Sequence, residues 1–388
     1  MPIPPAVQHL VADAQIWRRD IHQNPELLYD VELTAKYVAD RLSAFGCDEV
    51  KTSIGRTGVV GVIRGAKGAS ARAIGLRADM DALPIEEATN LPYRSRIPGK
   101  MHACGHDGHT AMLLGAARRL AETRNFAGNA VVIFQPAEEG GAGAMAMIDD
   151  GLMDRFGIEE VYGMHNWPAL PIGSFMLRQG PVMAAADEIT VTIEGQGGHA
   201  AMPHQCVDPV VLGAQIVLAL QTIASRNVDP LDACVVSVTR FEAGAASNII
   251  PQSAWLNGTV RTLQAATRDL AEKRIREIAA GLAAAAGGTA RVEYRRGYPA
   301  TVNHAAQTEF AAKVARKVVG ESRVDSNVAP VMGAEDFSFM LEARPGAFIF
   351  LGNGDSAKLH HPAYDFNDAA LPYGMSYWVE LVETALAP

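Results

Sequence analysis

The chain has 388 residues, enough for two domains of ordinary size, and its shares of 48% hydrophobic and 20% charged residues are typical of a soluble globular enzyme. The formal net charge of -9, with no run of Lys or Arg longer than two, argues against nucleic acid or an anionic membrane as a partner. Four widely spaced cysteines form no disulfide framework, and the N-terminus lacks a basic start followed by an apolar core, so no secretory signal and a cytoplasmic location are expected.

The first part of the chain alternates short apolar runs with helical patterns. Apolar residues recur on one helix face over Thr110–Leu120. Strands separated by helices indicate an α/β sheet that is covered by helices on both sides. The predicted strands of this part are Gly58–Ile63, Ala73–Leu76, Val131–Phe134 and Val161–Met164.

The pattern changes near Ala185, where Ile189, Val191 and Ile193 alternate with threonines, as in a half-exposed strand. A helix is expected over about 209–225; its apolar stretch is broken by glutamines and is shorter than the ~20 residues of a membrane span, which favours a buried or amphipathic helix. The next predicted elements are the strands Cys234–Phe241 and Ala254–Arg261, an alanine-rich helix to about Ala286, and the strand Ala290–Tyr294.

This β-α-β-β-α-β order is the ferredoxin-like pattern. After it the α/β character returns, with a helix at Glu309–Val319 and a strand at Ala347–Leu351. We therefore expect an α/β catalytic domain, built from residues 1–184 and 297–388 around a mixed sheet, with a ferredoxin-like domain inserted at residues 185–296.

Three His, one Cys and one Asp stand within eight residues in the segment HACGHDGH, residues 102–109, just before the amphipathic helix. Thiolate and imidazole are strong ligands for Zn²⁺ and its neighbours. Cys104 and His106 are two residues apart, so in an extended segment their side chains point the same way. The alternative is a polar helix start with a buried cysteine, but the density of ligand types favours a metal site.

Two adjacent carboxylates, Glu138 and Glu139, directly follow the apolar strand VVIF. Like charges side by side are unfavourable, and a division of labour would explain them: one binds metal while the other acts as general base. A solvated acidic turn is the structural alternative, and taken alone it would be preferred.

Other candidates follow apolar runs later in the chain. His165 and the pair His360-His361 could be metal ligands or satisfied packing residues. The glycine-rich segment Gly195–His204 either lets the backbone approach a ligand closely or forms a plain hairpin turn.

Nearly the whole chain resembles the hippurate hydrolase and indole-acetyl-amino-acid hydrolase branch of the aminoacylase-type dinuclear metallopeptidases. Ten motifs in the family's order carry the resemblance: RRDIHQNPEL, GLRADMDALPI, HACGHDGHTAMLLGAA, FQPAEEGGAGAMAM, GMHNWP, GQGGHAAMPH, SNIIP, GTVRT, MGAEDFS and HHPAYDFND.

The resemblance implies Glu138 as general base and places Asp79 where relatives support a metal-binding histidine, for which His106 is the expected partner here. It favours His360 over its neighbour His361 as a ligand. Two divalent ions are implied; the thiolate favours Zn²⁺, while carboxylate and imidazole also accept Mn²⁺, Co²⁺ or Ni²⁺. The implied metal ligands are Cys104, His106, Glu139, His165 and His360.

The resemblance also implies that the inserted domain acts as a lid and a dimerisation domain. It places His199, Asn248 and Arg261 over the substrate, with His199 helping to stabilise the oxyanion. The implied substrate is an N-acyl amino acid, such as an N-acetyl or N-benzoyl compound, whose amide is hydrolysed by metal-activated water.

Rival functions are tested against the same motifs. A dipeptidase, aminopeptidase or aminoacyl carboxypeptidase would use the same site, although an aminopeptidase should offer a carboxylate to the free amine. A non-catalytic metal-binding protein has no need of Glu138 beside Glu139. A zinc deaminase requires Pro-Cys-x-x-Cys and a thiol redox protein requires Cys-x-x-Cys, and the sequence contains neither.

Overall fold

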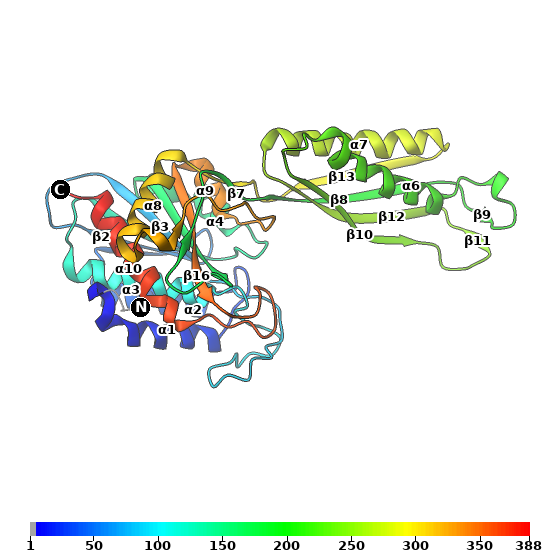
Figure 1. Ribbon diagram of the computed structural model, residues 1–388. Coiled ribbons are helices and arrows are strands. Elements are labelled where there is room, and N and C mark those ends of the chain that lie inside the picture. The colour runs from blue at the N-terminus through cyan, green and yellow to red at the C-terminus, as the bar shows by residue number, and fades with distance from the viewer. Residues whose placement is uncertain (1–4) are drawn as a thin grey trace. The chain divides into compact units, whose positions relative to one another are not determined.

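The computed structural model describes residues 5–388; the four residues before them, part of the segment in which no secretory signal is expected, lie outside the described residues. The chain forms two compact units (Figure 1). Unit 1 contains the described residues up to Gly180 together with Val302–Ala329 and Asp336–Pro388. Unit 2 contains Pro181–Thr301 and Pro330–Glu335.

Unit 2 includes more residues than the insertion predicted at residues 185–296. The main chain of the later segment bonds to the start of the unit, since the N–H of Ala184 donates to Gly333 and the N–H of Val331 donates to Val182. The strands β7 (Gly180–Met183) and β14 (Thr301–Asn303) contain two of the four points where the described chain passes between the units.

Unit 1 is built on an eight-stranded mixed sheet in the order β1-β2-β4-β3-β5-β16-β6-β15. The neighbours β4, β3, β5 and β16 run parallel, whereas β1, β2 and β4 pair antiparallel. Parallel strands are usually buried on both faces, and all seven residues of β3 are buried. The strands are β1 (Glu49–Ile54), β2 (Gly58–Arg64), β3 (Ala73–Asp79), β4 (Asn129–Gln135), β5 (Ile158–Pro168), β6 (Phe175–Met176), β15 (Val324–Asp325) and β16 (Gly346–Gly354).

Helices cover both faces of this sheet. One face, which includes Leu76 and Ala78 of β3, shares a continuous core with α1, α2, α3, α8 and α10. Residues alternate across a strand, so Arg77 faces the other way, where its guanidinium carbon lies 5.9 Å from the ring of Phe337 in α9. The helices of unit 1 are α1 (Val11–Gln23), α2 (Glu32–Ala44), α3 (His106–Thr123), α4 (Gly143–Asp149), α5 (Leu152–Arg155), α8 (Ala305–Val319), α9 (Phe337–Ala343) and α10 (Leu371–Ala385).

Unit 2 has the predicted ferredoxin-like topology. Its antiparallel sheet has the order β10-β12-β8-β13, and α6 and α7 share a core with it through residues such as Ile193, Ile216 and Ile275. A short antiparallel pair, β9 with β11, is additional to the predicted elements. The elements are β8 (Ala185–Glu194), β9 (Gly198–His199), α6 (Pro209–Thr222), β10 (Cys234–Ala243), β11 (Ile249–Ile250), β12 (Ser253–Thr262), α7 (Ala265–Ala285) and β13 (Thr289–Arg296).

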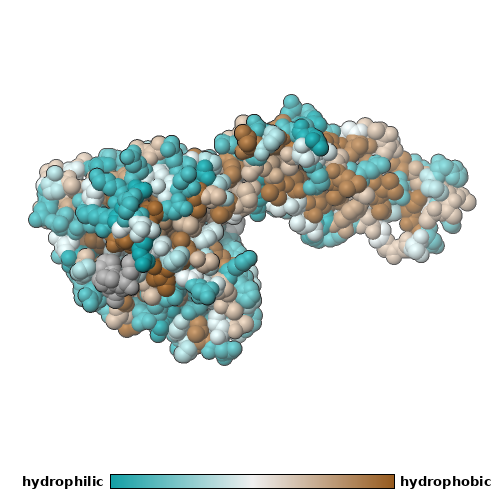
Figure 2. Space-filling view, viewed as in Figure 1, coloured by the Kyte–Doolittle hydropathy of each residue, from teal (hydrophilic) through white to brown (hydrophobic). Residues whose placement is uncertain are grey.

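The helical stretch Pro209–Asn227, which contains α6, is long and apolar enough to cross a membrane by length and composition alone. One such helix is weak evidence, because core helices pass the same test. Here Leu212 and Leu220 are buried in the core of unit 2, as expected for a helix that packs on a sheet. Its other side exposes apolar residues, and Figure 2 shows hydrophobic surface along this unit.

Candidate metal centre

Five side chains of unit 1 converge beyond the carboxyl ends of the central strands, the usual place for ligands in open α/β sheets. Cys104 precedes α3 and His106 begins it, Glu139 follows β4, His165 lies in β5, and His360 follows β16. Their ligand atoms lie within 4.8 Å of one another in overlapping groups of three. The structure thus brings together all five residues that the sequence indicates as ligands; we call them the ligand cluster.

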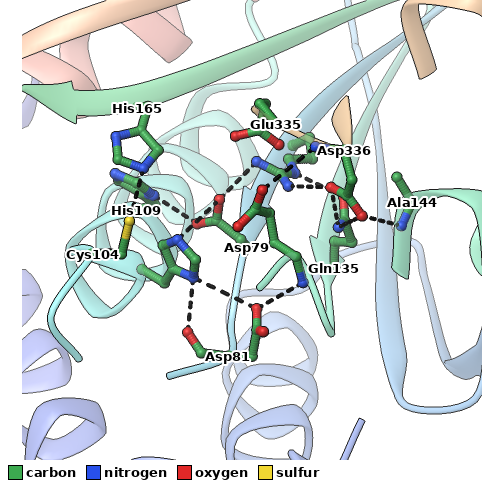
Figure 3. A network of polar contacts seen from close by, with 12 residues as sticks. Asp79, Asp81, Cys104, His109, Gln135, Ala144, His165, Glu335 and Asp336 are labelled. Carbon is green, nitrogen blue, oxygen red and sulfur yellow. Dashed lines mark hydrogen bonds and ion pairs between the residues drawn. The ribbon is translucent and has the colours of Figure 1, made fainter. Parts of the chain in front are cut away.

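The buried half of the ligand cluster contains Cys104, His106 and His165. Figure 3 shows the sulfur of Cys104 facing the ring of His165, with 3.3 Å between Sγ and Nε2. His165 Nδ1 donates to the carbonyl oxygen of Asn166 at 2.6 Å, and His106 Nδ1 donates to that of Asp81 at 2.8 Å. Each ring is therefore held by Nδ1 and directs Nε2 toward the cluster, as metal-binding histidines do.

Cys104 also belongs to a second group, with Glu139 and His360. His360 Nε2 lies 3.3 Å from Glu139 Oε1, whereas His361 Nδ1 accepts a hydrogen bond from the N–H of Ala363. His360 has a φ of 64°, an uncommon left-handed conformation that non-glycine residues adopt where the surroundings hold them. Of the two histidines, His360 is the one directed at the cluster.

The residues of the cluster fit a pair of divalent cations. The buried Nε2 of His106 has no hydrogen-bond partner among residues 5–388, although buried polar atoms are normally paired. The donors are imidazole nitrogen, thiol sulfur and carboxylate oxygen, which suit Zn²⁺ and neighbouring ions. The two groups share Cys104.

Close backbone packing fixes the segment that carries Cys104. The Nδ2 of Asn166 donates to the carbonyl oxygen of Cys104 at 2.6 Å, and the hydroxyl of Tyr364 donates to Asn166 Oδ1 at 2.7 Å. Gly105 has a φ of 89°, and a Cβ there would lie 2.3 Å from Asn166 Nδ2. Only glycine fits this position, which explains the residue between the two ligands of the motif.

The carboxylate of Asp81 holds the two adjacent glutamates. Its Oδ1 accepts the N–H of Glu138 at 3.0 Å, and its Oδ2 accepts the N–H of Glu139 at 3.1 Å. The same residue holds His106 through its carbonyl oxygen. Asp81 therefore positions one expected base and two expected ligands without being one itself.

Asp79 differs from the expectation that it supports His106. Its Oδ1 accepts a hydrogen bond from His109 Nδ1 at 2.6 Å, while its Oδ2 lies 3.7 Å from His106 Nε2. His109 Nε2 in turn accepts the N–H of Asn166 at 2.9 Å. Both nitrogens of His109 are thus engaged, so its proximity to Asp79 and His106 supports the cluster rather than forming another metal site.

Without cations the cluster holds protons that a metal centre would not. Burial alone would lower the pKa of His106, but the charges of Asp79, Asp81 and Glu139 raise it to about 10. Burial, and then the charge of Glu139, raises the pKa of the Cys104 thiol well above its usual range. Thiolate and neutral imidazole are the forms that bind metal, so cation binding must displace these protons.

Glu138 and Glu139 face different partners despite their adjacency. Glu138 is 7% exposed, and its Oε1 accepts the N–H of Asp336 at 3.4 Å. A carboxylate oxygen of Glu138 also lies within 4.8 Å of ligand atoms of His106 and Glu139. Glu139 instead contacts His360. One carboxylate thus lies in the cluster and the other beside it, which suits a ligand and a base.

The three expected substrate residues lie at two ends of the sheet of unit 2. His199 pairs in register with Ile249, the residue after Asn248, on the ladder of β9 and β11. This ladder adjoins the start of β12 at Ser253, whereas Arg261 lies eight residues along that strand, about 26 Å away at ~3.3 Å per residue. The structure brings His199 and Asn248 together and leaves Arg261 apart.

Sequence reasoning missed Asp81, Arg77 and Asp336. All three stand in motifs quoted above, GLRADMDALPI and MGAEDFS, so the signal was present in the sequence. Their role depends on partners distant in the chain; Asp81 accepts the N–H of a residue 57 positions away. A local pattern does not show such a contact.

Comparisons with known proteins give a matching family and several similar proteins. The sequence profile of peptidase family M20/M25/M40 matches residues 75–384. The chain is 44% identical to hippurate hydrolase of Campylobacter jejuni, over 98% of each chain, and 38% identical to N-acetylcysteine deacetylase of Bacillus subtilis, over 95% of this chain and 96% of that one. A dinuclear metal binding peptidase of the M20 family from Bacillus subtilis has a similar crystal structure, with a TM-score of 0.86 and 34% identity over 98% of this chain and 99% of that one.

Proposed function

Since the chain belongs to peptidase family M20/M25/M40, we propose that it hydrolyses the amide bond of N-acyl amino acids, releasing a carboxylate and a free amino acid. The observation that carries this proposal is the convergence of five ligand-type side chains beside the separately held carboxylate of Glu138. The names of the relatives support the substrate class, since they include enzymes of hippurate and N-acetylcysteine.

The ligand cluster would hold two divalent cations. The Cys104 thiolate favours Zn²⁺, and the remaining imidazole and carboxylate ligands also suit Mn²⁺, Co²⁺ or Ni²⁺. When bound, such cations supply Lewis acidity that polarises the amide carbonyl and lowers the pKa of water.

Glu138 acts as the general base and then as the general acid. It takes a proton from the attacking water and passes it to the departing amide nitrogen, so that no covalent intermediate is needed. The N–H of Asp336 and the carboxylate of Asp81 hold its side chain and its backbone, respectively. Preorganisation of this kind keeps the base in place through both proton transfers.

Unit 2 contributes the substrate contacts. Arg261 offers a planar guanidinium that matches the α-carboxylate of an N-acyl amino acid, and His199 donates to the oxyanion that forms on the amide carbonyl. The distance of about 26 Å between the two ends of β12 supports a division of these roles between two chains, because a small N-acyl amino acid cannot span it.

We propose that two chains form a two-fold dimer through unit 2, in which each site uses the partner's His199 and its own Arg261. Unit 2 offers the surface for this. β10 is an edge strand that exposes Phe241, and α6 exposes Val211 and Leu218. Unpaired edges and exposed apolar patches are typical of surfaces that bind another chain.

The substrate proposal is tested by supplying the protein with each cation in turn and assaying release of free amine. The substrates are N-acetyl, N-benzoyl and indole-acetyl amino acids, with dipeptides and neutral amides for comparison. We expect release from one or more of the acyl amino acids and none from neutral amides. Hydrolysis of dipeptides alone would favour a peptidase, and inactivity with every cation and acyl amino acid would refute the proposal.

A further inference from the structure

A buried arginine lies beneath the ligand cluster. Arg77 is 1% exposed and stands on β3 two residues before Asp79, so both side chains project from the same face. Its Nε donates to Gln135 Oε1 at 2.8 Å, one terminal nitrogen donates to Asp79 Oδ2 at 2.7 Å, and the other donates to Asp336 Oδ1 at 3.0 Å. The guanidinium thus joins three buried groups, and the proposed mechanism has not used it.

One arm of this network reaches the ligands. Asp79 Oδ1 accepts from His109, whose Nε2 accepts the N–H of Asn166. Asn166 directly follows the ligand His165, and its amide holds the carbonyl of Cys104 at 2.6 Å. Three successive contacts therefore lead from Arg77 to the main-chain N–H of Asn166, next to His165, and a fourth leads to the carbonyl of Cys104.

The other arm reaches the base. Asp336 Oδ2 accepts the N–H of Ala144 at 2.9 Å and a hydrogen bond from Gln135 Nε2 at 2.9 Å. The N–H of Asp336 itself donates to Glu138 Oε1. A Cβ on Gly143 would lie 1.7 Å from the carbonyl oxygen of Pro136, so the loop that carries Glu138 is tightly packed as well.

We infer that Arg77 is a positioning residue that fixes the general base Glu138 relative to the ligand cluster through Asp79 on one side and Asp336 on the other. This rests on the proposed function, in which Glu138 is the base. The guanidinium suits the task because its planar donors bind three groups in set directions, which a lysine ammonium on a flexible stem cannot reproduce.

The test compares wild type with two variants. Arg77→Lys keeps the positive charge, and Asp336→Asn keeps the size of the side chain in the arm that leads to Glu138. Four quantities are measured: kcat and KM with an N-acyl amino acid that the wild type hydrolyses, bound metal per chain, and the thermal unfolding temperature. Leu381→Ala is the matched control, since it removes a buried side chain from α10 without touching the network.

We expect kcat of both network variants to fall about 100-fold, the effect of a small misplacement of reacting groups, while KM and bound metal stay near wild type. The control should unfold at a lower temperature and keep its kcat. If Arg77→Lys does not fold, Asp336→Asn alone decides the matter.

Each of the following results would overturn the inference. The network variants could lose only thermal stability, like the control, which would make Arg77 purely structural. They could instead lose metal and regain full kcat when metal is added, which would limit the network to the ligands. A wild type that hydrolyses no N-acyl amino acid would defeat the proposed function and the inference together, whereas an active wild type with unaffected variants defeats the inference alone.

Discussion

Adjacent residues in the loop after β4 have different surroundings, and their chemistry follows from these. Glu139 faces His360 and His106, where a positive ion belongs, whereas Glu138 accepts a main-chain N–H at the edge of the cluster. Asp81 holds both backbone N–H groups, so the loop cannot rotate to exchange the two side chains without breaking buried hydrogen bonds.

We predict that Glu138→Gln lowers kcat by about 10²–10⁴-fold or more while bound metal stays at the wild-type level, because the amide cannot take a proton but leaves the ligands intact. Elemental analysis and turnover of the purified variant are the measurements. Glu139→Gln is the matched control and should lose metal. If the two variants behave the other way round, the roles of the glutamates are exchanged.

Metal binding is predicted to tighten steeply with pH. In the cation-free protein the pKa of His106 is raised to about 10 and that of Cys104 lies above its usual range, so both are protonated near neutral pH. Binding displaces both protons, and the apparent affinity should rise about 100-fold per pH unit between pH 6 and 8. Chelator competition at several pH values measures the slope. Cys104→Ser should weaken binding and lower the slope by about one proton; a slope near zero in the wild type would contradict the assignment.

At the scale of elements, α1 is tied to the start of α3 by buried charges. His22 Nδ1 lies 2.8 Å from Asp107 Oδ2, and Arg18 contacts Asp107 and Asp368. Asp107 directly follows His106 of the ligand cluster, so this contact secures the helix start that presents His106. A buried charge is stable only with partners of this kind.

This contact predicts a loss of stability at alkaline pH. Burial alone would lower the pKa of His22, but Asp107 raises it to about 9. A group whose pKa is higher in the folded state stabilises the fold fully below its unfolded value of ~6.5 and loses that contribution as the pH rises through its folded value. The free energy of unfolding should thus fall by up to roughly 3 kcal/mol between pH 6.5 and 9. Denaturant titrations across this range test it, and His22→Gln should remove this part of the dependence; an unchanged profile in the variant would rule out His22 as its source.

The elements that sequence predicted best are those with plain apolar patterns. In β8, Ile189, Val191 and Ile193 face the core, so the alternation in the sequence is also the alternation in burial. The helix α1 was not predicted, because its buried face includes Arg18 and His22, which a hydrophobic pattern counts as exposed. Their burial depends on acidic partners up to 350 positions away.

The same reason explains which residues of the candidate site could be predicted from the sequence and which could not. The segment HACGHDGH and the two adjacent glutamates indicated a metal site by their density of ligand types, whereas the full set of five expected ligands followed from the family resemblance. The structure brings all five side chains together. Arg77 and Asp336 were not predicted, because a polar residue in an apolar strand shows its purpose only through its partner, here 259 positions away. Asp79 contacts two histidines that are one helical turn apart: the expected partner His106 lies 3.7 Å away, and the hydrogen bond comes from His109 at 2.6 Å.

At the scale of the whole molecule, two units with separate cores carry different parts of the proposed chemistry. Unit 1 holds the ligand cluster and Glu138, while unit 2 holds the proposed substrate residues His199, Asn248 and Arg261. The sequence contains both sets of residues. Whether the two sets form a site within one chain or a site shared by two chains depends on the assembly, which a single chain does not show.

Complementation between two inactive chains tests the shared site. Glu138→Ala and His199→Ala chains are expressed together under different tags, and the mixed dimer is purified. If His199 acts on the partner's site, each mixed dimer contains one intact site and should show about half the activity of the wild-type dimer. A mixed dimer as inactive as its parents, or a fully active monomer, would exclude the shared site.

The length of β12 also has a consequence for the activity of the protein at low concentration. If Arg261, near the end of that strand, and His199, on the ladder next to its start, serve different sites, an isolated chain has no complete site, and turnover is governed by mass action between chains. Activity per milligram should then stay constant at high concentration and decline on serial dilution around the dissociation constant of the dimer. A crowded cell would keep the sites complete, whereas a dilute assay would report an enzyme that seems to weaken with time as its chains separate.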